Sequence, residues 1–218
     1  MVNKNFILGL DLGQANDFTA LGVIEVQPDR VYHIRRLERV RGVAYPDVAE
    51  KVHKIMKALG GGALVVDQTG VGAPVVDLLK KAGLNPVAVS IHGGDSVTHE
   101  GRNWRVPKRN LVAVLQVLLQ TSRLKVSSGL KLGPDLQKEM LNFKVKIDPV
   151  TAHDSYSAWR ENDHDDMVLA TALACWWAES RPKPQPPLVL PMPTKEQMIT
   201  PRHRIGGYDG QPRVPKFF

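Results

Sequence analysis

The 218-residue sequence contains one cysteine and no long apolar run. The single cysteine, Cys175, excludes an internal disulfide and a cysteine-rich zinc site, and it favours a reducing compartment. No apolar stretch approaches the roughly 20 residues that are needed to cross a bilayer. The first residues, MVNKNF, lead directly into a strand-like segment and leave no room for a signal peptide. We therefore expect a cytoplasmic protein without a membrane partner.

The excess of basic residues is concentrated at the C-terminal end. The formal net charge is +7, yet residues 1–180 carry 22 basic and 20 acidic side chains, against seven and two in residues 181–218. Prolines also gather after residue 180, in RPKPQPPLVLPMP, where they remove backbone donors and favour extended chain. We predict a globular domain over 1–180 and a flexible, proline-rich basic tail over 181–218. A polyanionic partner is compatible with this charge.

The hydrophobic pattern before residue 180 predicts a mixed α/β domain. Three strand-like runs with short connections favour an antiparallel arrangement, and the later alternation of helices and strands favours parallel pairing. We expect a ribonuclease H-like mixed five-stranded sheet, with strands 1–3 antiparallel and helices on both faces. The predicted strands are 6–12, 19–26, 31–40, 63–66 and 86–91; the predicted helices are 46–59, 72–82, 106–121, 132–141 and 164–180; residues 92–106 are predicted as a polar loop.

Aspartates interrupt or adjoin the segments that the pattern predicts to be most buried. Asp11 lies inside ILGLDLG, Asp67 ends ALVVD, and Asp165 and Asp166 begin the apolar last helix. An ionised carboxylate in apolar surroundings costs several kcal/mol unless it is paired or binds a metal. No Lys or Arg stands beside Asp11 or Asp67 in the sequence, so a cation from solution is the simplest partner. Mg²⁺ or Mn²⁺ suits these oxygen ligands, and two such ions about 3.5–4 Å apart can flank a phosphate.

Each aspartate also has a purely structural interpretation. Asp11 could accept hydrogen bonds from the turn at residues 13–16, and Asp67 could begin a turn. Asp165 and Asp166 could be acids favoured by the helix dipole, with Asp163 as the N-cap. Their joint occurrence in this strand and helix context favours the metal site.

Three segments carry a resemblance to a known family. The run FILGLDLGQANDFTALGVIEV resembles the first hairpin of ribonuclease H-like nucleases. ALVVDQTGVG and HDDMVLATALA resemble the second acidic strand and the C-terminal acidic helix of the nuclease domain of phage terminase large subunits, in the ribonuclease H-like or resolvase-like superfamily. One element of those subunits is missing from the sequence, since no glycine-rich phosphate loop ending in Lys-Ser or Lys-Thr is present.

This resemblance implies a metal-dependent endonuclease that hydrolyses phosphodiester bonds of double-stranded DNA during viral genome packaging, in the host cytoplasm. It implies Asp11, Asp67 and Asp166 as catalytic metal ligands and Asp165 as an auxiliary one, with Mg²⁺ or Mn²⁺ as a pair of ions. Double-stranded DNA, a packaging ATPase domain or subunit, and the portal are the partners that it implies.

Basic residues next to Trp104 form a candidate DNA-binding segment in the predicted loop. A backbone track for DNA needs such cations, although a solvated loop has the same composition. The residues are Arg102, Arg105, Lys108 and Arg109.

Three other functions fit part of the pattern. A Holliday-junction resolvase-like nuclease shares the fold and the metal chemistry. An ATP-binding domain of the sugar-kinase and actin kind has a similar first loop, but no second phosphate loop is evident. A non-catalytic module that docks on a packaging motor through the tail would need no metal.

Overall fold

The computed structural model describes residues 5–13, 17–147, 154–157 and 164–182. Eight strands of this part form one sheet, in the order β6-β7-β5-β4-β1-β2-β3-β8, and β1, β2 and β3 are antiparallel. Parallel pairs join β4 to β1 and β5, β7 to β5, and β8 to β3, whereas β6 is antiparallel to β7. The bounds are β1 Asn5–Asp11, β2 Phe18–Val26, β3 Tyr32–Arg41, β4 Ala63–Asp67, β5 Val87–His92, β6 Thr98–Glu100, β7 Asn103–Pro107 and β8 Leu124–Val126.

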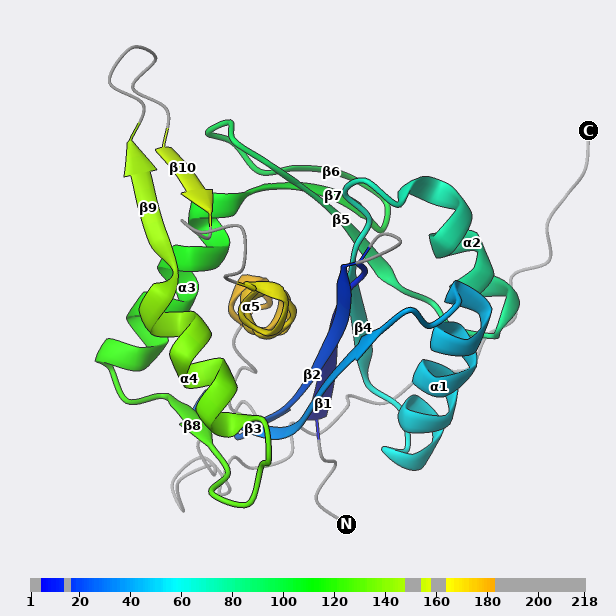
Figure 1. Ribbon diagram of the computed structural model, residues 1–218, viewed down its shortest axis with the longest axis horizontal. Coiled ribbons are helices and arrows are strands. Elements are labelled where there is room, and N and C mark those ends of the chain that lie inside the picture. The colour runs from blue at the N-terminus through cyan, green and yellow to red at the C-terminus, as the bar shows by residue number, and fades with distance from the viewer. Residues whose placement is uncertain (1–4, 14–16, 148–153, 158–163, 183–218) are drawn as a thin grey trace, which may run out of the picture. The chain divides into compact units, whose positions relative to one another are not determined.

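Helices cover both faces of this sheet (Figure 1). On one face, α1 (Tyr45–Ala58) and α2 (Gly72–Lys81) pack on the even-numbered side chains of β1 and β4. On the other face lies α5 (Asp166–Ser180), with α3 (Lys108–Gln120) and α4 (Gly133–Asn142) against its far side. A separate two-stranded sheet pairs β9 (Lys144–Ile147) with β10 (Asp154–Ser157). No helix in the described ranges is long and apolar enough to cross a membrane.

The predicted fold class is confirmed, and the five predicted strands form the continuous block β5-β4-β1-β2-β3. The predicted loop over 92–106 is wrong, because it contains the β6–β7 hairpin that extends the sheet beyond five strands. In β7 the inward-facing Trp104 and Val106 alternate with exposed polar residues, and this alternation over a short segment resembles the composition of a polar loop. The short strand β8 extends the other edge. The predicted tail from residue 183 onward lies outside the described residues.

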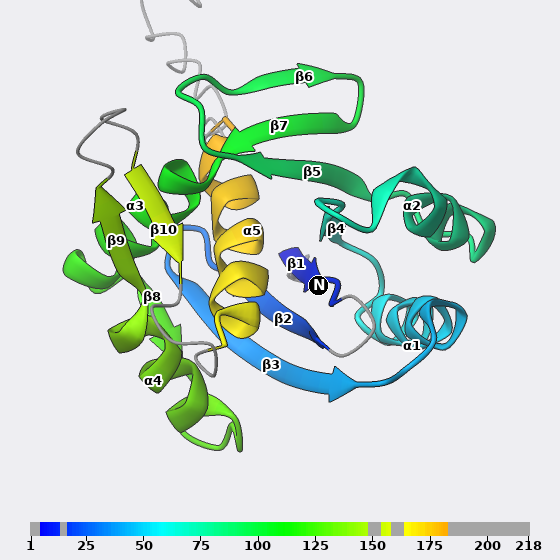
Figure 2. The same cartoon turned by 45° about the horizontal axis from the view of Figure 1, so that its top comes forward.

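Helix α5 is apolar on every side because protein surrounds it. Figure 2 shows it running across the curved sheet, with α3 and α4 opposite. Gly9 and Gly22 face each other in the β1–β2 register, directly under this helix. A Cβ atom on Gly9 would lie 1.9 Å from the carbonyl oxygen of Ala170, so only glycine permits this contact. The close approach determines how near the first turn of α5 comes to the end of β1.

Candidate metal centre

Asp11 and Asp67 lie at the ends of adjacent parallel strands. The register pairs Leu10 of β1 with Val66 of β4, which places the two aspartates side by side one position further along. Because side chains alternate along a strand, Asp11 shares its face with Gly9, and Asp67 shares its face with Val65, which packs in the α5 core. Both carboxylates therefore belong to the α5 side of the sheet.

Asp165 and Asp166 stand at the N-terminal end of α5. Asp165 is the N-cap residue, but its side chain makes no capping hydrogen bond, and Asp166 is the first helical residue. The Asp166 side chain is 15% exposed, and its Oδ2 atom is buried without a hydrogen-bond partner. Asp163, which we predicted as the N-cap, lies outside the described residues. The start of α5 thus brings two carboxylates to the strand ends.

The four carboxylates act on one another electrostatically. Burial raises the pKa of Asp11 well above its ordinary value, and Asp67, Asp166 and Asp165 raise this pKa further. Burial also raises the pKa of Asp67, although hydrogen bonds from Thr69 oppose the rise. The pKa of Asp166 is raised by burial and by Asp165. Segments far apart in the sequence therefore create one site of concentrated negative charge.

Lys108 enters this cluster, which sequence analysis did not foresee. Its Nζ atom lies 3.0 Å from Oδ2 of Asp165, and its charge opposes the rise in the pKa of Asp11 and of Asp67. No Lys or Arg is adjacent to Asp11 or Asp67 in the sequence, but the fold brings Lys108 close enough for its charge to act on both. Lys108 follows directly after β7, and the parallel pairing of β7 with β5 carries it to the same end of the sheet.

One lysine does not balance four carboxylates, and the remaining charge fits a divalent cation. The donors are carboxylate oxygens, which Mg²⁺ and Mn²⁺ prefer, and the buried Oδ2 of Asp166 accepts no hydrogen bond, although Nδ1 of His164 lies 3.7 Å from it. Within the described ranges, no three His, Cys, Asp or Glu side chains already stand as ligands of one ion.

The structure supports the turn interpretation for Asp67 but not the one for Asp11. Oδ1 of Asp67 accepts a 2.7 Å hydrogen bond from the amide of Thr69, so Asp67 does begin a turn. The amide of Gly13 donates to Oγ1 of Thr19 at 3.1 Å rather than to Asp11. The turn bond of Asp67 uses one carboxylate oxygen and leaves the second for another partner.

Three of the four predicted DNA-binding residues make contacts within the protein. Arg102 donates hydrogen bonds to the carbonyl oxygens of Asn85 and Pro86, Arg109 is paired with Asp95, and Lys108 belongs to the acidic cluster. Arg105 is exposed, and strand alternation places it on the face opposite Trp104 and α5. Trp104 contacts the rings of Trp176 and Trp177 and is a packed aromatic.

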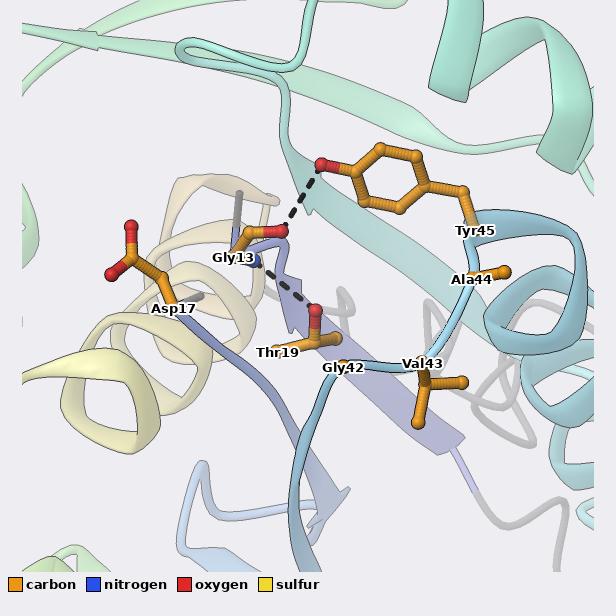
Figure 3. A pocket seen from close by; sticks show the side chains of 7 residues that line it. All are labelled: Gly13, Asp17, Thr19, Gly42, Val43, Ala44 and Tyr45. Atoms are coloured by element: carbon orange, nitrogen blue, oxygen red, sulfur yellow. Dashed lines mark hydrogen bonds between the residues drawn. The ribbon is translucent and has the colours of Figure 1, made fainter. Parts of the chain in front are cut away.

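A pocket of about 320 Å³ lies beside the cluster, between the β1–β2 turn and the segment that leads into α1. In Figure 3 the hydroxyl of Tyr45 points at the carbonyl oxygen of Gly13, to which it donates at 3.1 Å. The described lining contains one acidic and no basic side chain, so its charge does not suit a phosphate group. Its lining residues are Gly13, Asp17, Thr19, Gly42, Val43, Ala44 and Tyr45.

Sequence analysis did not identify Glu139, a buried acid near the same end of α5. It is 7% exposed, and burial raises its pKa to about 7 against hydrogen bonds from the amides of Val168 and Met167 and the charge of Arg39. Its helical spacing from Leu136 was the available signal, because it places an acid on the apolar face of α4.

Comparison with solved structures finds the same fold in phage terminases. The large terminase nuclease from thermophilic phage G20c with bound magnesium has a TM-score of 0.63 and 21% identity, over 80% of this chain and 82% of that chain. The nuclease domain of the g2p large terminase of bacteriophage SPP1 with bound manganese has a TM-score of 0.51 and 15% identity, over 78% and 84%. For the HK97 bacteriophage large terminase the values are 0.57 and 14%, over 80% of this chain but 39% of that chain.

No curated protein matches the sequence. The family model of the terminase RNaseH-like domain, in contrast, matches residues 8–176. This match includes both strand-end aspartates and most of α5. The chain therefore belongs to the terminase RNaseH-like domain family.

Proposed function

We propose that this protein is a metal-dependent endonuclease that hydrolyses phosphodiester bonds of double-stranded DNA during viral genome packaging. The observation that carries the proposal is the convergence of Asp11, Asp67, Asp165 and Asp166 at one end of the sheet, where burial and neighbouring carboxylates raise the pKa values of Asp11, Asp67 and Asp166. The family membership and the metals in the related nucleases support it.

In this proposal Asp11, Asp67 and Asp166 bind Mg²⁺ or Mn²⁺, as a pair of ions, and Asp165 assists. Metal ions bound in such a site activate water and stabilise negative charge on a phosphate. The ion pair of Lys108 with Asp165 holds that carboxylate toward the cluster. The ammonium group of Lys108 also offers a donor to a phosphate oxygen of DNA that enters the site.

The proposed partners are double-stranded DNA, a packaging ATPase domain or subunit, and the portal. The match to 39% of the HK97 large terminase supports a role as one functional part of a larger packaging machine. Arg105 is an exposed cation of the predicted DNA-binding set in β7, next to the edge strand β6, and we propose that it contacts the DNA backbone.

The test is cleavage of supercoiled plasmid by the purified protein with Mn²⁺, with Mg²⁺ or with EDTA. We expect cleavage with either metal and none with EDTA. Asp11→Asn keeps the size of the side chain but removes a charged ligand, so cleavage should fall at least about 100-fold while the fold persists. The matched control is Asp47→Asn on the exposed start of α1, which should cleave like wild type. Full activity of Asp11→Asn would refute the proposal.

A further inference from the structure

Glu139 of α4 caps the N-terminal end of α5. Its Oε2 atom accepts hydrogen bonds from the backbone amides of Met167 and Val168, at 3.1 and 3.2 Å. The first amides of a helix have no partner within the helix, and Asp165 at the N-cap does not supply one with its side chain. A carboxylate in this position is also favoured by the helix dipole. The cap of α5 therefore comes from another helix.

Arg39 of β3 holds the other oxygen of the same carboxylate. Its Nη1 atom lies 2.7 Å from Oε1 of Glu139, and both side chains are largely buried. The guanidinium group of Arg39 also stands 4.9 Å from the ring centre of Phe18 in β2. A buried glutamate is rare unless it is paired, and this one uses both oxygens to join β3, α4 and α5.

The place of this connection is the first turn of α5, which carries Asp165 and Asp166. The carboxylates of the cluster repel one another, and an unrestrained first turn would move outward to relieve that repulsion. Two backbone hydrogen bonds from Glu139 oppose such a movement at residues 167 and 168, directly after Asp166.

We propose that Glu139 is a positioning residue of the nuclease: it holds the first turn of α5 so that Asp165 and Asp166 reach the metal ions bound by Asp11 and Asp67. This inference rests on the proposed function. Glu139 itself need not touch metal or DNA. Its effect passes through the helix backbone, as that of outer residues passes through the ligands that they orient.

The test compares Glu139→Gln with Glu179→Gln, a matched change at the opposite end of α5. Glu179 accepts hydrogen bonds from Tyr32 and Arg123, so it also anchors this helix to neighbouring elements. For each variant we would measure the Mn²⁺ dissociation constant by calorimetry, kcat and KM for DNA cleavage, and stability in urea. We expect Glu139→Gln to weaken Mn²⁺ binding about 10- to 100-fold and to lower kcat with little change in KM. Glu179→Gln should lose stability and keep wild-type Mn²⁺ affinity.

A second variant, Glu139→Asp, keeps the charge but withdraws the carboxylate by about 1.5 Å, one carbon–carbon bond. We expect it to weaken Mn²⁺ binding in the same direction, which makes the test independent of whether the glutamine variant folds. Wild-type affinity in either folded Glu139 variant, or an equal loss in Glu179→Gln, would overturn the positioning role alone. A wild-type protein that neither binds Mn²⁺ nor cleaves DNA would overturn the proposed function as well.

Discussion

The replacement Gly9→Ala tests whether the contact between β1 and α5 determines the geometry of the acidic cluster. The added Cβ atom would lie 1.9 Å from the carbonyl oxygen of Ala170 and 3.1 Å from the amide nitrogen of Ala174. Both atoms are backbone, so no side-chain rotation relieves the overlap. A carbon–oxygen contact is ordinarily no shorter than about 3.3 Å. Strand and helix must therefore separate by about 1.4 Å at this point, the difference between the two distances.

The separation should reduce both stability and catalysis. Overpacking of a core typically costs about 1–3 kcal/mol, and we expect a loss of unfolding free energy in that range. Asp11 is two residues from Gly9 on the same face, so it moves relative to Asp166. A misplacement of about 1 Å can lower a reaction rate about 100-fold, and we expect plasmid cleavage with Mn²⁺ to fall by that order.

Gly22→Ala is the matched control in the neighbouring strand. Its Cβ atom would come no closer than 3.3 Å to Oγ1 of Thr171, a side-chain atom that can adjust. We expect a smaller loss of stability than for Gly9→Ala, and cleavage near the wild-type rate. Urea unfolding followed by tryptophan fluorescence and plasmid cleavage measure the two effects. Wild-type cleavage by a folded Gly9→Ala protein would refute the reasoning.

Three further predictions concern charge. Lys108→Met removes the 3.0 Å ion pair with Asp165, so urea unfolding in EDTA should show a loss of about 1–2 kcal/mol of unfolding free energy. DNA cleavage should fall as well, and an unchanged stability and cleavage rate would place Lys108 outside the site. The folded pKa of Glu139 is raised from 4.5 to about 7, so its contribution to stability is present below pH 4.5 and is lost as pH rises through 7. Relative to Glu139→Gln, the metal-free wild type should lose about 3 kcal/mol of unfolding free energy between pH 4.5 and pH 8, at about 1.4 kcal/mol per pH unit up to the folded pKa. The same pH dependence of the unfolding free energy in both proteins would contradict this. Mn²⁺ at 100 times the dissociation constant measured at pH 8 should stabilise the protein by about 3 kcal/mol at that pH. The same Mn²⁺ concentration should stabilise it less at pH 5.5, because the raised pKa values of Asp11 and Asp166 favour protonated ligands in acid. A melting temperature that does not respond to Mn²⁺ would exclude the site.

Local patterns in the sequence identified the framework of the site. Asp11 and Asp67 were recognisable because each stands in or after a run of buried apolar residues, where a charge is costly. The uniformly apolar sequence of α5 indicated a helix covered on all sides, and it is covered in this way. These signals depend on neighbours in the chain, which a sequence displays directly.

Features that depend on residues distant in the chain could not be predicted in the same way. Lys108 meets Asp165 because β7 pairs with β5, and β7 was hidden by its polar outward-facing residues. The spacing of Glu139 from Leu136 indicates an acid on the apolar face of α4, but its partners, the amides of α5, follow only from the position of that helix. The strand β8 has only three residues, which is too short to show a hydrophobic period, and it pairs with the first residues of β3.

The arrangement of α5 has a consequence for biosynthesis. β1 is translated first and α5 roughly 150 residues later, yet the two are in direct contact through Gly9 and Ala170. A nascent chain that ends before α5 lacks Asp165 and Asp166 as well as the helix that covers one face of the sheet. Incomplete chains on the ribosome therefore cannot bring the four carboxylates of the acidic centre together.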